Sequence, residues 1–220
     1  MRELKIAGVM ITCPGRGLML AATLKDLRQH EPDLPLHIQL DESTSGRRQE
    51  RQAQNSLAAL TVGLNKFPDA NVLLFLEDDI IFNRHLVHNL QRWTPLRNLA
   101  TSIPGPQPSA RKLFFGSLYD PNVREIRMVE AEHYFIADPE AVYGSQAFVM
   151  SRAMAEHFVA HWHSIPGMQD IKMSRLAAQL GSIFYHLPSL VQHVGVQSTW
   201  TTDNRFHDTK YFDRDFKAPA

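Results

Sequence analysis

The sequence predicts an α/β protein built on a mostly parallel β-sheet flanked by helices. Strand-like segments alternate with segments of helical periodicity over residues 4–82. Residues 72–76 are all apolar, as expected of a strand that is buried on both faces of a parallel sheet. Right-handed crossovers make such strands parallel and bring their carboxyl ends to one edge. Sheets of this kind bind ligands at that edge.

The composition is that of an ordinary globular protein. The 220 residues are 44% hydrophobic and 21% charged, which suits one domain with a substantial core. Lys plus Arg and Asp plus Glu number 23 each, so no net field favours nucleic acid or an anionic membrane. Cys13 is the only cysteine, which excludes an intrachain disulfide and favours a reducing, cytoplasmic location. No apolar run is long enough for a transmembrane segment, and the short run at 6–11 suits a first strand better than a signal peptide.

The first half of the chain alternates strands with helices. Leucines at spacings of four and three predict a helix that ends before Glu31, and a second apolar stripe predicts a longer helix that ends before Pro68. Polar loops follow the first two strands, at 13–17 and 41–46. The predicted strands of this half are residues 4–12, 36–40 and 72–82.

The second half changes character after a loop rich in proline and serine at 101–109. Asn83 is predicted to cap a helix before this loop, Ser151 a helix after it, and Asp170 lies in the first turn of the last predicted helix. The predicted strands of this half are residues 113–119, 123–128, 143–150 and 183–187.

The chain beyond residue 199 is polar and aromatic with little periodicity. Such a segment is typical of a flexible tail or a lid. The predicted division is therefore a domain at 1–200 followed by a C-terminal tail or lid at 201–220.

Three adjacent carboxylates, Glu77, Asp78 and Asp79, end the third strand before its apolar run resumes. Adjacent carboxylates repel one another, and a hard divalent cation with oxygen ligands is the simplest source of compensation. A solvated acidic turn that closes a strand is the alternative. Apolar residues on both sides favour a cleft over such a turn.

Four short segments together resemble the GT-A glycosyltransferases. They are Glu-Asp-Asp-Ile at 77–80, Tyr-Gly-Ser-Gln-Ala-Phe at 143–148, Gln-Asp at 169–170 and Pro-Ser-Leu-Val-Gln-His-Val-Gly at 188–195. The first and last are most similar to inverting N-acetylglucosaminyltransferases and related hexosamine transferases. The resemblance spans about residues 4 to 200, and residues 104–138 match nothing in it. It implies the GT-A (nucleotide-diphospho-sugar transferase) fold, a Rossmann-like mostly parallel sheet flanked by helices.

The resemblance also implies a metal-dependent hexosyl- or N-acetylhexosaminyltransferase with a UDP-sugar donor. The acceptor hydroxyl would belong to a carbohydrate, a lipid-linked glycan or a protein, and transfer would invert the anomeric centre. Asp79 and His193 are implied as ligands of the metal, and Mn²⁺ tolerates such mixed oxygen and nitrogen donors better than Mg²⁺, the alternative ion. Glu77 and Asp78 are assigned to donor binding, although Glu77 departs from the commoner Asp-x-Asp pattern. Taken alone, His193 indicates a structural histidine.

The loops after the first two strands are where GT-A folds hold uracil and ribose. The resemblance assigns Thr12, Pro14 and Arg16 of the first loop and Asp41 of the second to nucleotide binding, and Arg48 to a phosphate or the base. The structural alternatives are that the arginines are solvated and that Asp41 caps the helix that follows.

Asp170 is implied as the general base, because similar inverting enzymes place an acidic residue at the start of this helix. Stabilisation of the N-terminal amides of the helix is the alternative role of Asp170. Ser145 and Gln146 are assigned to the donor sugar, and Tyr143 to stacking on a ring. A strand edge and a core aromatic are the structural alternatives for these three residues.

Other functions and sites remain open at this stage. A catalytically inactive nucleotide-sugar-binding or scaffold protein is one alternative, and a sugar nucleotidyltransferase is another, although loop 14–17 matches the glycine-rich, lysine-containing loop of that class poorly. His157 and His161 have the spacing of a two-histidine metal site on a helix but lack its glutamate, which favours a surface face. Glu130 and Glu132 are predicted to form a loop or, alternatively, an acidic patch, and Asp138 joins them as a reserve carboxylate for the general base.

Overall fold

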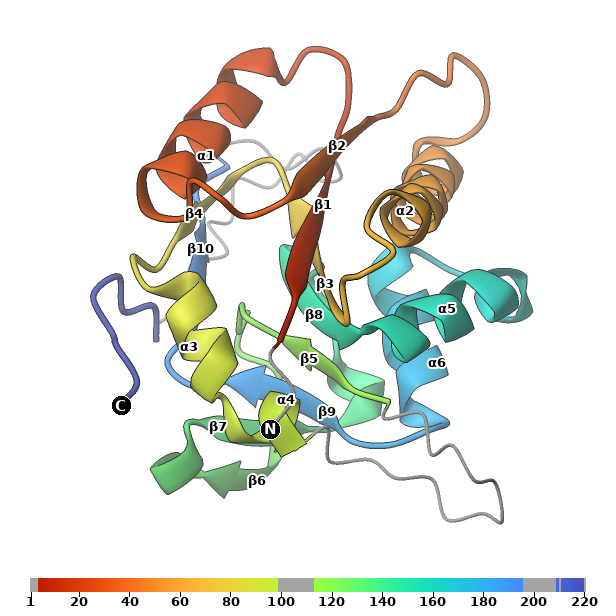
Figure 1. Ribbon diagram of the computed structural model, residues 1–220. Helices are drawn as coiled ribbons and strands as arrows, with labels where there is room; N and C mark the ends of the chain where they lie inside the picture. Colours follow the sequence, from red (N-terminus) through yellow and green to blue (C-terminus); the bar gives the residue numbers. More distant parts are fainter. Residues whose placement is uncertain (1–3, 99–112, 196–208, 210, 220) are drawn as a thin grey trace.

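The computed structural model describes residues 4–98, 113–195, 209 and 211–219 (Figure 1). The strands are β1 (Ile6–Thr12), β2 (Leu36–Leu40), β3 (Val72–Glu77), β4 (Ile80–Phe82), β5 (Phe115–Ser117), β6 (Glu125–Val129), β7 (Tyr134–Ala137), β8 (Ala147–Ser151), β9 (Ile183–His186) and β10 (Val191–His193). The helices are α1 (Gly17–His30), α2 (Arg48–Lys66), α3 (Leu86–Arg92), α4 (Thr94–Asn98), α5 (Arg152–His161) and α6 (Gln169–Ala178). Three short 3₁₀ helices are η1 (Glu130–Glu132), η2 (Pro139–Ala141) and η3 (Trp162–Ser164).

The described strands form one large mixed sheet in the order β2-β1-β3-β8-β5-β9-β7-β6, and a separate ribbon of β4 and β10. Strand β1 runs parallel to β2 and β3, and β5 parallel to β9, whereas β8 and β7 run antiparallel to both of their neighbours. Six of the eight strands of the described sheet therefore point the same way, and only β7 and β8 oppose them. The predicted α/β class and mostly parallel sheet are confirmed.

A hydrophobic core fills each face of the sheet. Along β3, Leu73 and Phe75 face one core together with apolar residues of α2, α5 and α6, while Val72, Leu74 and Leu76 face the other with residues of α1 and α3. All five side chains are fully buried, and each such side chain contributes about 1.5–3 kcal/mol relative to exposure. Figure 1 shows α2, α5 and α6 on one side of the sheet and α1 and α3 on the other. Burial on both faces holds β3, and the carboxylates at its end, in a fixed position.

The single strand predicted over 72–82 is wrong in one respect, because it is two strands separated by a turn at Asp78 and Asp79. Strand β3 ends at Glu77, and β4 leaves the large sheet to pair antiparallel with β10, with Ile80 opposite His193. Periodicity along one segment cannot show this, since both strands are apolar and the partner of β4 lies far along the chain. The turn brings Asp79 beside the end of β10.

Other predicted elements are confirmed in type but differ at their ends. Helices α1, α2, α5 and α6 occupy the predicted segments, and the Ser151 hydroxyl accepts from the Met154 backbone N–H as the predicted cap of α5. The strand predicted over 143–150 begins only at Ala147. Strands β7 and β10 were not predicted, because they are only four and three residues long, respectively, and lack an alternating pattern.

Asn83 does not cap α3, which starts at Leu86. Its side chain instead binds the C-terminal segment, residues 211–219, by donating to the backbone oxygens of Asp213 (2.8 Å) and Phe216 (2.9 Å). The Asn89 amide donates to the same Phe216 oxygen at 2.9 Å. Figure 1 shows this segment beside β10 and α3. The predicted tail therefore ends in residues that pack on the domain, and residues 201–208 lie outside the described part of the chain, as does the loop predicted at 101–109.

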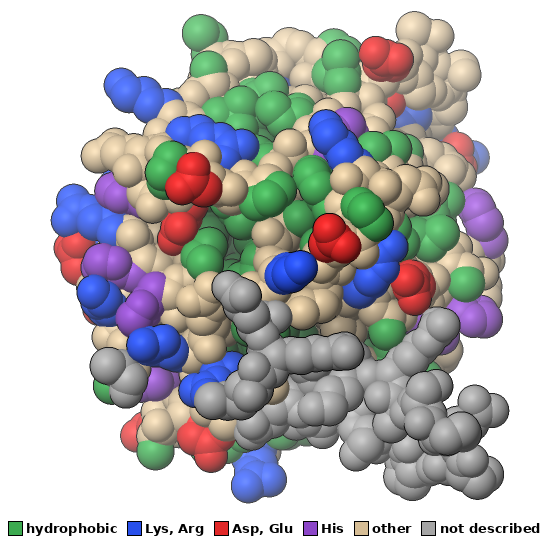
Figure 2. All heavy atoms as spheres, viewed as in Figure 1, with side chains coloured by type: hydrophobic (Ala, Val, Ile, Leu, Met, Phe, Trp, Pro, Cys, Tyr) green, Lys and Arg blue, Asp and Glu red, His purple; other side chains and the backbone are tan. Residues whose placement is uncertain are grey.

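The surface agrees with the neutral composition. On the face drawn in Figure 2, basic and acidic side chains of the described residues are interspersed rather than gathered by sign. In the described part of the chain, no helix combines the length and the apolar character that crossing a membrane requires.

Candidate active site

The carboxyl ends of β1, β2 and β3 meet at one edge of the sheet. Thr12 lies opposite Leu40 in the register of β1 and β2, and the backbone N–H of Asp41 donates to the Thr12 carbonyl at 2.9 Å. Because β8 runs antiparallel to β3, its amino end comes to the same edge, where the Glu77 N–H donates to the Gln146 carbonyl at 3.0 Å. The topology thus brings together residues that the sequence separates by more than a hundred positions.

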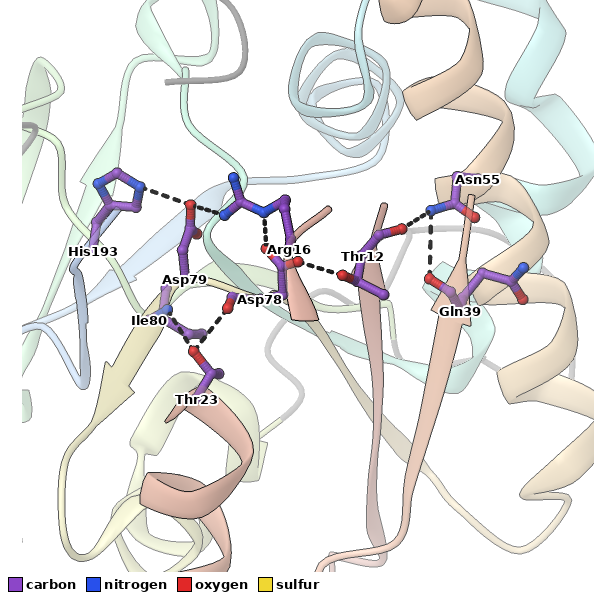
Figure 3. A network of polar contacts seen from close by, with 9 residues as sticks. All are labelled: Thr12, Arg16, Thr23, Gln39, Asn55, Asp78, Asp79, Ile80 and His193. Carbon is purple, nitrogen blue, oxygen red and sulfur yellow. Dashed lines mark hydrogen bonds and ion pairs between the residues drawn. The ribbon is translucent and has the colours of Figure 1, made fainter. Parts of the chain in front are cut away.

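Arg16 joins two of the three adjacent carboxylates (Figure 3). Its Nε lies 2.7 Å from Asp78 Oδ1, and its Nη2 lies 2.5 Å from Asp79 Oδ2. The Thr12 hydroxyl donates to the other oxygen of Asp78. The Asp78 and Asp79 side chains are only 5% and 8% exposed, so these charge-assisted bonds compensate carboxylates that are shielded from water. Burial nevertheless raises the pKa of the Asp78 carboxyl.

The turn that carries Asp78 and Asp79 is fixed by a threonine of α1. The Thr23 hydroxyl donates to the Asp78 carbonyl at 2.8 Å and accepts from the Ile80 N–H at 3.3 Å. From the other side, the Val194 N–H donates to the Asp79 carbonyl at 2.8 Å. The turn is therefore held by backbone-directed hydrogen bonds from two elements, which orients both carboxylates toward Arg16.

Asp79 and His193 form a second pair at this turn. His193 Nε2 lies 3.1 Å from Asp79 Oδ2, and both side chains are about nine-tenths buried. Burial raises the pKa of Asp79, but the hydrogen bond and charge of His193 and the charge of Arg16 outweigh it and leave that pKa below its ordinary value. Burial lowers the pKa of His193, and the bond to Asp79 raises it above the ordinary value in net. The contact therefore favours the charged form of both side chains.

Two observations indicate room for a ligand at the pair of Asp79 and His193. Asp79 Oδ1 is buried and has no hydrogen-bond partner among the described residues. Gly195 passes so close that a Cβ built there would lie 2.7 Å from both Asp79 Oδ2 and His193 Nε2. A glycine at this position keeps the facing edges of the two side chains clear.

A divalent cation fits this pair. Two ligand atoms on adjacent octahedral positions, each about 2.1 Å from an ion, are about 3 Å apart, close to the 3.1 Å between Asp79 Oδ2 and His193 Nε2. Within the described ranges, no three His, Cys, Asp or Glu side chains group as a metal site. An ion at this pair would therefore take its remaining ligands from a substrate and water.

A second chain of polar contacts starts at Glu77. The Ser145 hydroxyl donates to Glu77 Oε1, and Gln169 Nε2 donates to Ser145 Oγ at 2.8 Å. Burial, followed by the charge of Asp79, raises the pKa of Glu77 to about 7. The side-chain oxygens Gln169 Oε1 and Gln146 Oε1 are buried without a partner in the part of the chain that the structure describes.

Asp170 lies at the same edge, in the first turn of α6. Its Oδ2 accepts from the Gly144 N–H at 3.1 Å, and its Oδ1 accepts from the Ile171 N–H at 2.9 Å. Gly144 directly precedes Ser145, so Asp170 adjoins the polar chain from Glu77. Tyr143 is 45% exposed and donates to the Pro121 carbonyl at 2.9 Å, so it is not a core aromatic.

The predicted nucleotide residues line the loops after β1 and β2. Asp41 is buried, accepts from the Ser43 N–H at 3.0 Å and pairs with Arg51 Nε at 3.4 Å. It therefore stabilises its own loop and does not cap α2, which Arg47 precedes. Pro14 is exposed in the loop after β1, and Arg48 is exposed as the first residue of α2.

Two solved structures share this architecture over most of their length. One is a glycosyltransferase involved in the glycosylation of the major capsid of PBCV-1, with a TM-score of 0.51 and 10% identity over 88% of this chain and 94% of that one. The chain has a GT-A-type fold. The protein A197 from STIV is also similar, with a TM-score of 0.51 and 14% identity over 99% of this chain and 98% of that one. No protein-family model and no curated protein sequence matches the chain.

Within the GT-A-type fold, the predicted metal, donor and base residues all come to one edge, and their roles remain predictions. The sequence analysis assigned no role to Thr23, Gln169 or Gly195. Thr23 lies within a helical pattern. Gln169 and Gly195 lie in segments that carry the resemblance, but their contacts with Ser145, Asp79 and His193 appear only in the folded chain. The neighbouring His-x-Gly sequence at 193–195 was the one available hint. The reserve carboxylates Glu130 and Glu132 lie in η1, and Asp138 pairs with Arg124 and accepts from the Glu140 N–H.

Proposed function

We propose that this protein is a metal-dependent glycosyltransferase that moves a sugar from a UDP-sugar to an acceptor hydroxyl with inversion. The observation that carries the proposal is the buried pair of Asp79 and His193, 3.1 Å apart, at the carboxyl edge of the sheet. A GT-A-type fold in which Arg16 lies beside this pair supports it, because a diphosphate needs positively charged partners and Arg16 is one. The likeness to N-acetylglucosaminyltransferases extends the proposal to N-acetylhexosamine or hexose donors.

Asp79 and His193 would hold Mn²⁺ or Mg²⁺. The ion would neutralise the diphosphate as it becomes the leaving group. The chain's own contribution is to hold both ligands still: Thr23 fixes the turn before Asp79, and the pairing of β4 with β10 fixes His193 opposite Ile80. Fixed ligands and dipoles stabilise developing charge without a further cost of reorganisation.

The uridine would lie across the loops after β1 and β2. Thr12, Pro14 and Asp41 would surround uracil and ribose, and Arg16 and Arg48 would contact phosphates. Glu77, Asp78, Ser145 and Gln146 would contact the donor. The chain from Glu77 through Ser145 to Gln169 is buried and hydrogen-bonded, which suits recognition of sugar hydroxyl or amide groups at fixed positions.

Asp170 would accept the proton of the acceptor hydroxyl. Two backbone N–H groups hold its carboxylate, yet each oxygen keeps a further acceptor position. Exposed apolar side chains adjoin it, since Tyr143 is 45% and Ile171 37% exposed. These would form the rim on which a carbohydrate, a lipid-linked glycan or a protein acceptor rests.

The test measures UDP binding by calorimetry with Mn²⁺ and with EDTA. Wild-type protein should bind UDP at least about tenfold more tightly with Mn²⁺, and Asp79→Asn or His193→Ala should abolish that difference. Asp215→Asn, which alters a surface ion pair, serves as the control and should retain it. GDP at equal concentration should compete weakly, because its base is larger and presents a different edge to Asp41.

A second readout is slow hydrolysis of UDP-sugars, in which water replaces the unidentified acceptor. NMR of freshly released sugar should show an inverted anomeric centre. Equal UDP affinity with and without metal, or equal competition by GDP, would remove the basis for a metal-dependent enzyme that uses uridine.

A further inference from the structure

Arg16 is already bound to the residue that the proposed cation needs. Its guanidinium donates from Nε to Asp78 and from Nη2 to Asp79. The Arg16 side chain is only 19% exposed. The Nη2 contact is to Asp79 Oδ2, the same oxygen that His193 Nε2 approaches at 3.1 Å. Figure 3 shows Arg16 and His193 on opposite sides of the Asp79 carboxylate. Arg16 Nη2 and His193 Nε2 therefore share one carboxylate oxygen.

We propose that Arg16 is the resident cation of this site: it neutralises Asp78 and Asp79 in the free protein, and it must release Asp79 before a divalent cation binds there. This inference rests on the proposed function, because it concerns how that site admits its ion. A metal ion at Asp79 Oδ2 and a guanidinium hydrogen-bonded to the same oxygen would repel each other at short range. The free protein should consequently bind the metal ion alone weakly.

The surroundings of Arg16 allow this movement. Arg16 lies in the loop after β1, and a Cβ built at Gly15 or Gly17, its two neighbours, would meet no atom within 4 Å. The loop is therefore not packed against other elements on these sides. Asp78 is held independently by the Thr12 hydroxyl, so its carboxylate keeps a partner while the guanidinium turns.

A nucleotide diphosphate gives the released guanidinium a new partner. Planar guanidinium groups bind phosphate oxygens through two parallel hydrogen bonds, a geometry that a carboxylate pair and a diphosphate both satisfy. Arrival of the diphosphate at Arg16 would therefore free Asp79 for the metal ion. Metal and UDP should bind with positive coupling, and that coupling must be reciprocal.

The experiment titrates Mn²⁺ without nucleotide and follows the free ion by electron paramagnetic resonance. The proteins compared are wild type, Arg16→Gln, Arg16→Lys and Arg175→Gln, the last as a control that removes a surface arginine paired with Glu140 at 3.4 Å. Arg16→Gln should bind Mn²⁺ alone about tenfold or more tightly than wild type, and Arg175→Gln should match wild type. Addition of UDP should raise Mn²⁺ affinity strongly in wild type and much less in Arg16→Gln.

Arg16→Lys distinguishes the effect of the two guanidinium contacts from the effect of the positive charge. Lysine keeps the positive charge but cannot bridge two carboxylates as a guanidinium does, so Mn²⁺ affinity should lie between those of wild type and Arg16→Gln. This variant also decides the matter if circular dichroism shows that Arg16→Gln does not fold. A lysine variant no different from wild type would then overturn the inference.

The outcomes distinguish this inference from the proposed function. Equal Mn²⁺ affinity of wild type and Arg16→Gln without nucleotide overturns the role of Arg16, while joint binding of UDP and Mn²⁺ would leave the proposed function standing. Tighter Mn²⁺ binding by Arg16→Gln in a protein that never binds UDP supports the role of Arg16 and overturns the proposed function. Absence of Mn²⁺ binding under every condition overturns both.

Discussion

The two oxygens of the Asp79 carboxylate differ in their hydrogen-bond partners. Oδ2 accepts from Arg16 and faces His193, whereas Oδ1 is buried without a partner among the described residues. An unsatisfied buried acceptor costs about 1–3 kcal/mol, which proteins tolerate mainly where a ligand or water completes the contact. Oδ1 is therefore a further acceptor position, beside the pair formed by Oδ2 and His193, that a ligand or water can fill.

Asp170→Asn should separate binding from turnover. The amide keeps the shape of the carboxylate and its oxygen can still accept from a backbone N–H, but it cannot take a proton. UDP affinity should therefore stay within about twofold of wild type, while the rate of UDP-sugar hydrolysis falls by roughly 10² to 10⁴. Stopped assays of UDP release and calorimetry on the same preparation measure both quantities.

The control for this change is Asp138→Asn, since Asp138 serves the turn at η2 and pairs with Arg124. It should leave hydrolysis unchanged. A wild-type rate in Asp170→Asn would show that the base is elsewhere, and loss of activity in the control would point to Asp138 itself.

His186 should make the protein sensitive to acid. It is 2% exposed, donates from Nδ1 to the Pro188 carbonyl at 2.7 Å and packs against Trp93; burial lowers its pKa from 6.5 to about 4. The unfolded chain therefore binds a proton near pH 6.5 that the folded chain binds only near pH 4. The contribution of neutral His186 to the free energy of unfolding is therefore fully present above pH 6.5 and is lost as the pH falls toward 4.

The measurement compares wild type with His186→Asn, which retains a donor but does not titrate. The free energy of unfolding in urea should rise by about 2–3 kcal/mol more in wild type than in the variant between pH 4.5 and pH 7. Parallel pH profiles for the two proteins would show that the pKa of His186 is the same in the folded and unfolded states.

At the scale of elements, the helices and central strands could be predicted because each carries its own periodic signal. The whole of β2 and the ends of α1 follow from local spacing and from the prolines and polar loops beside them. The ribbon of β4 and β10 could not be predicted, because its existence depends on a pairing between distant three-residue segments. The candidate site shows the same division: the carboxylates that follow β3 were predicted, whereas the roles of Thr23 and Gln169, which lie on helices and contact the turn and Ser145, were not.

The C-terminal segment should be a stabilising element. Asn83 is fully buried and its amide satisfies two carbonyls of that segment, so Asn83→Ala leaves the Asp213 and Phe216 oxygens without this donor. The expected loss is about 2–3 kcal/mol in the free energy of unfolding, measured by urea denaturation.

Arg84→Ala is the matched control for the same segment. Its ion pair with Asp215 joins side chains that are 50% and 69% exposed, so its removal should change stability by less than about 0.5 kcal/mol. Similar losses in both variants would mean that the buried amide contributes no more than the surface pair.

At the scale of the molecule, the candidate site lies where the two halves of the fold meet. The parallel first half supplies Arg16, Asp78 and Asp79, and the later half supplies Asp170 and His193. Burial of β3 on both faces makes it the common support of the two halves. Changes to either core near its end would move the carboxylates relative to their partners in the other half.

The pairing of Ile80 with His193 sets an order of events during synthesis. Asp79 and His193 are 114 positions apart, so at roughly 10 residues per second a ribosome needs about ten seconds to supply the second member of the pair after the first. Throughout that interval the nascent chain has its acidic turn and Arg16 but lacks the imidazole. A chain that terminates before β10 would thus contain the loops after β1 and β2 in full but lack His193, the partner of Asp79.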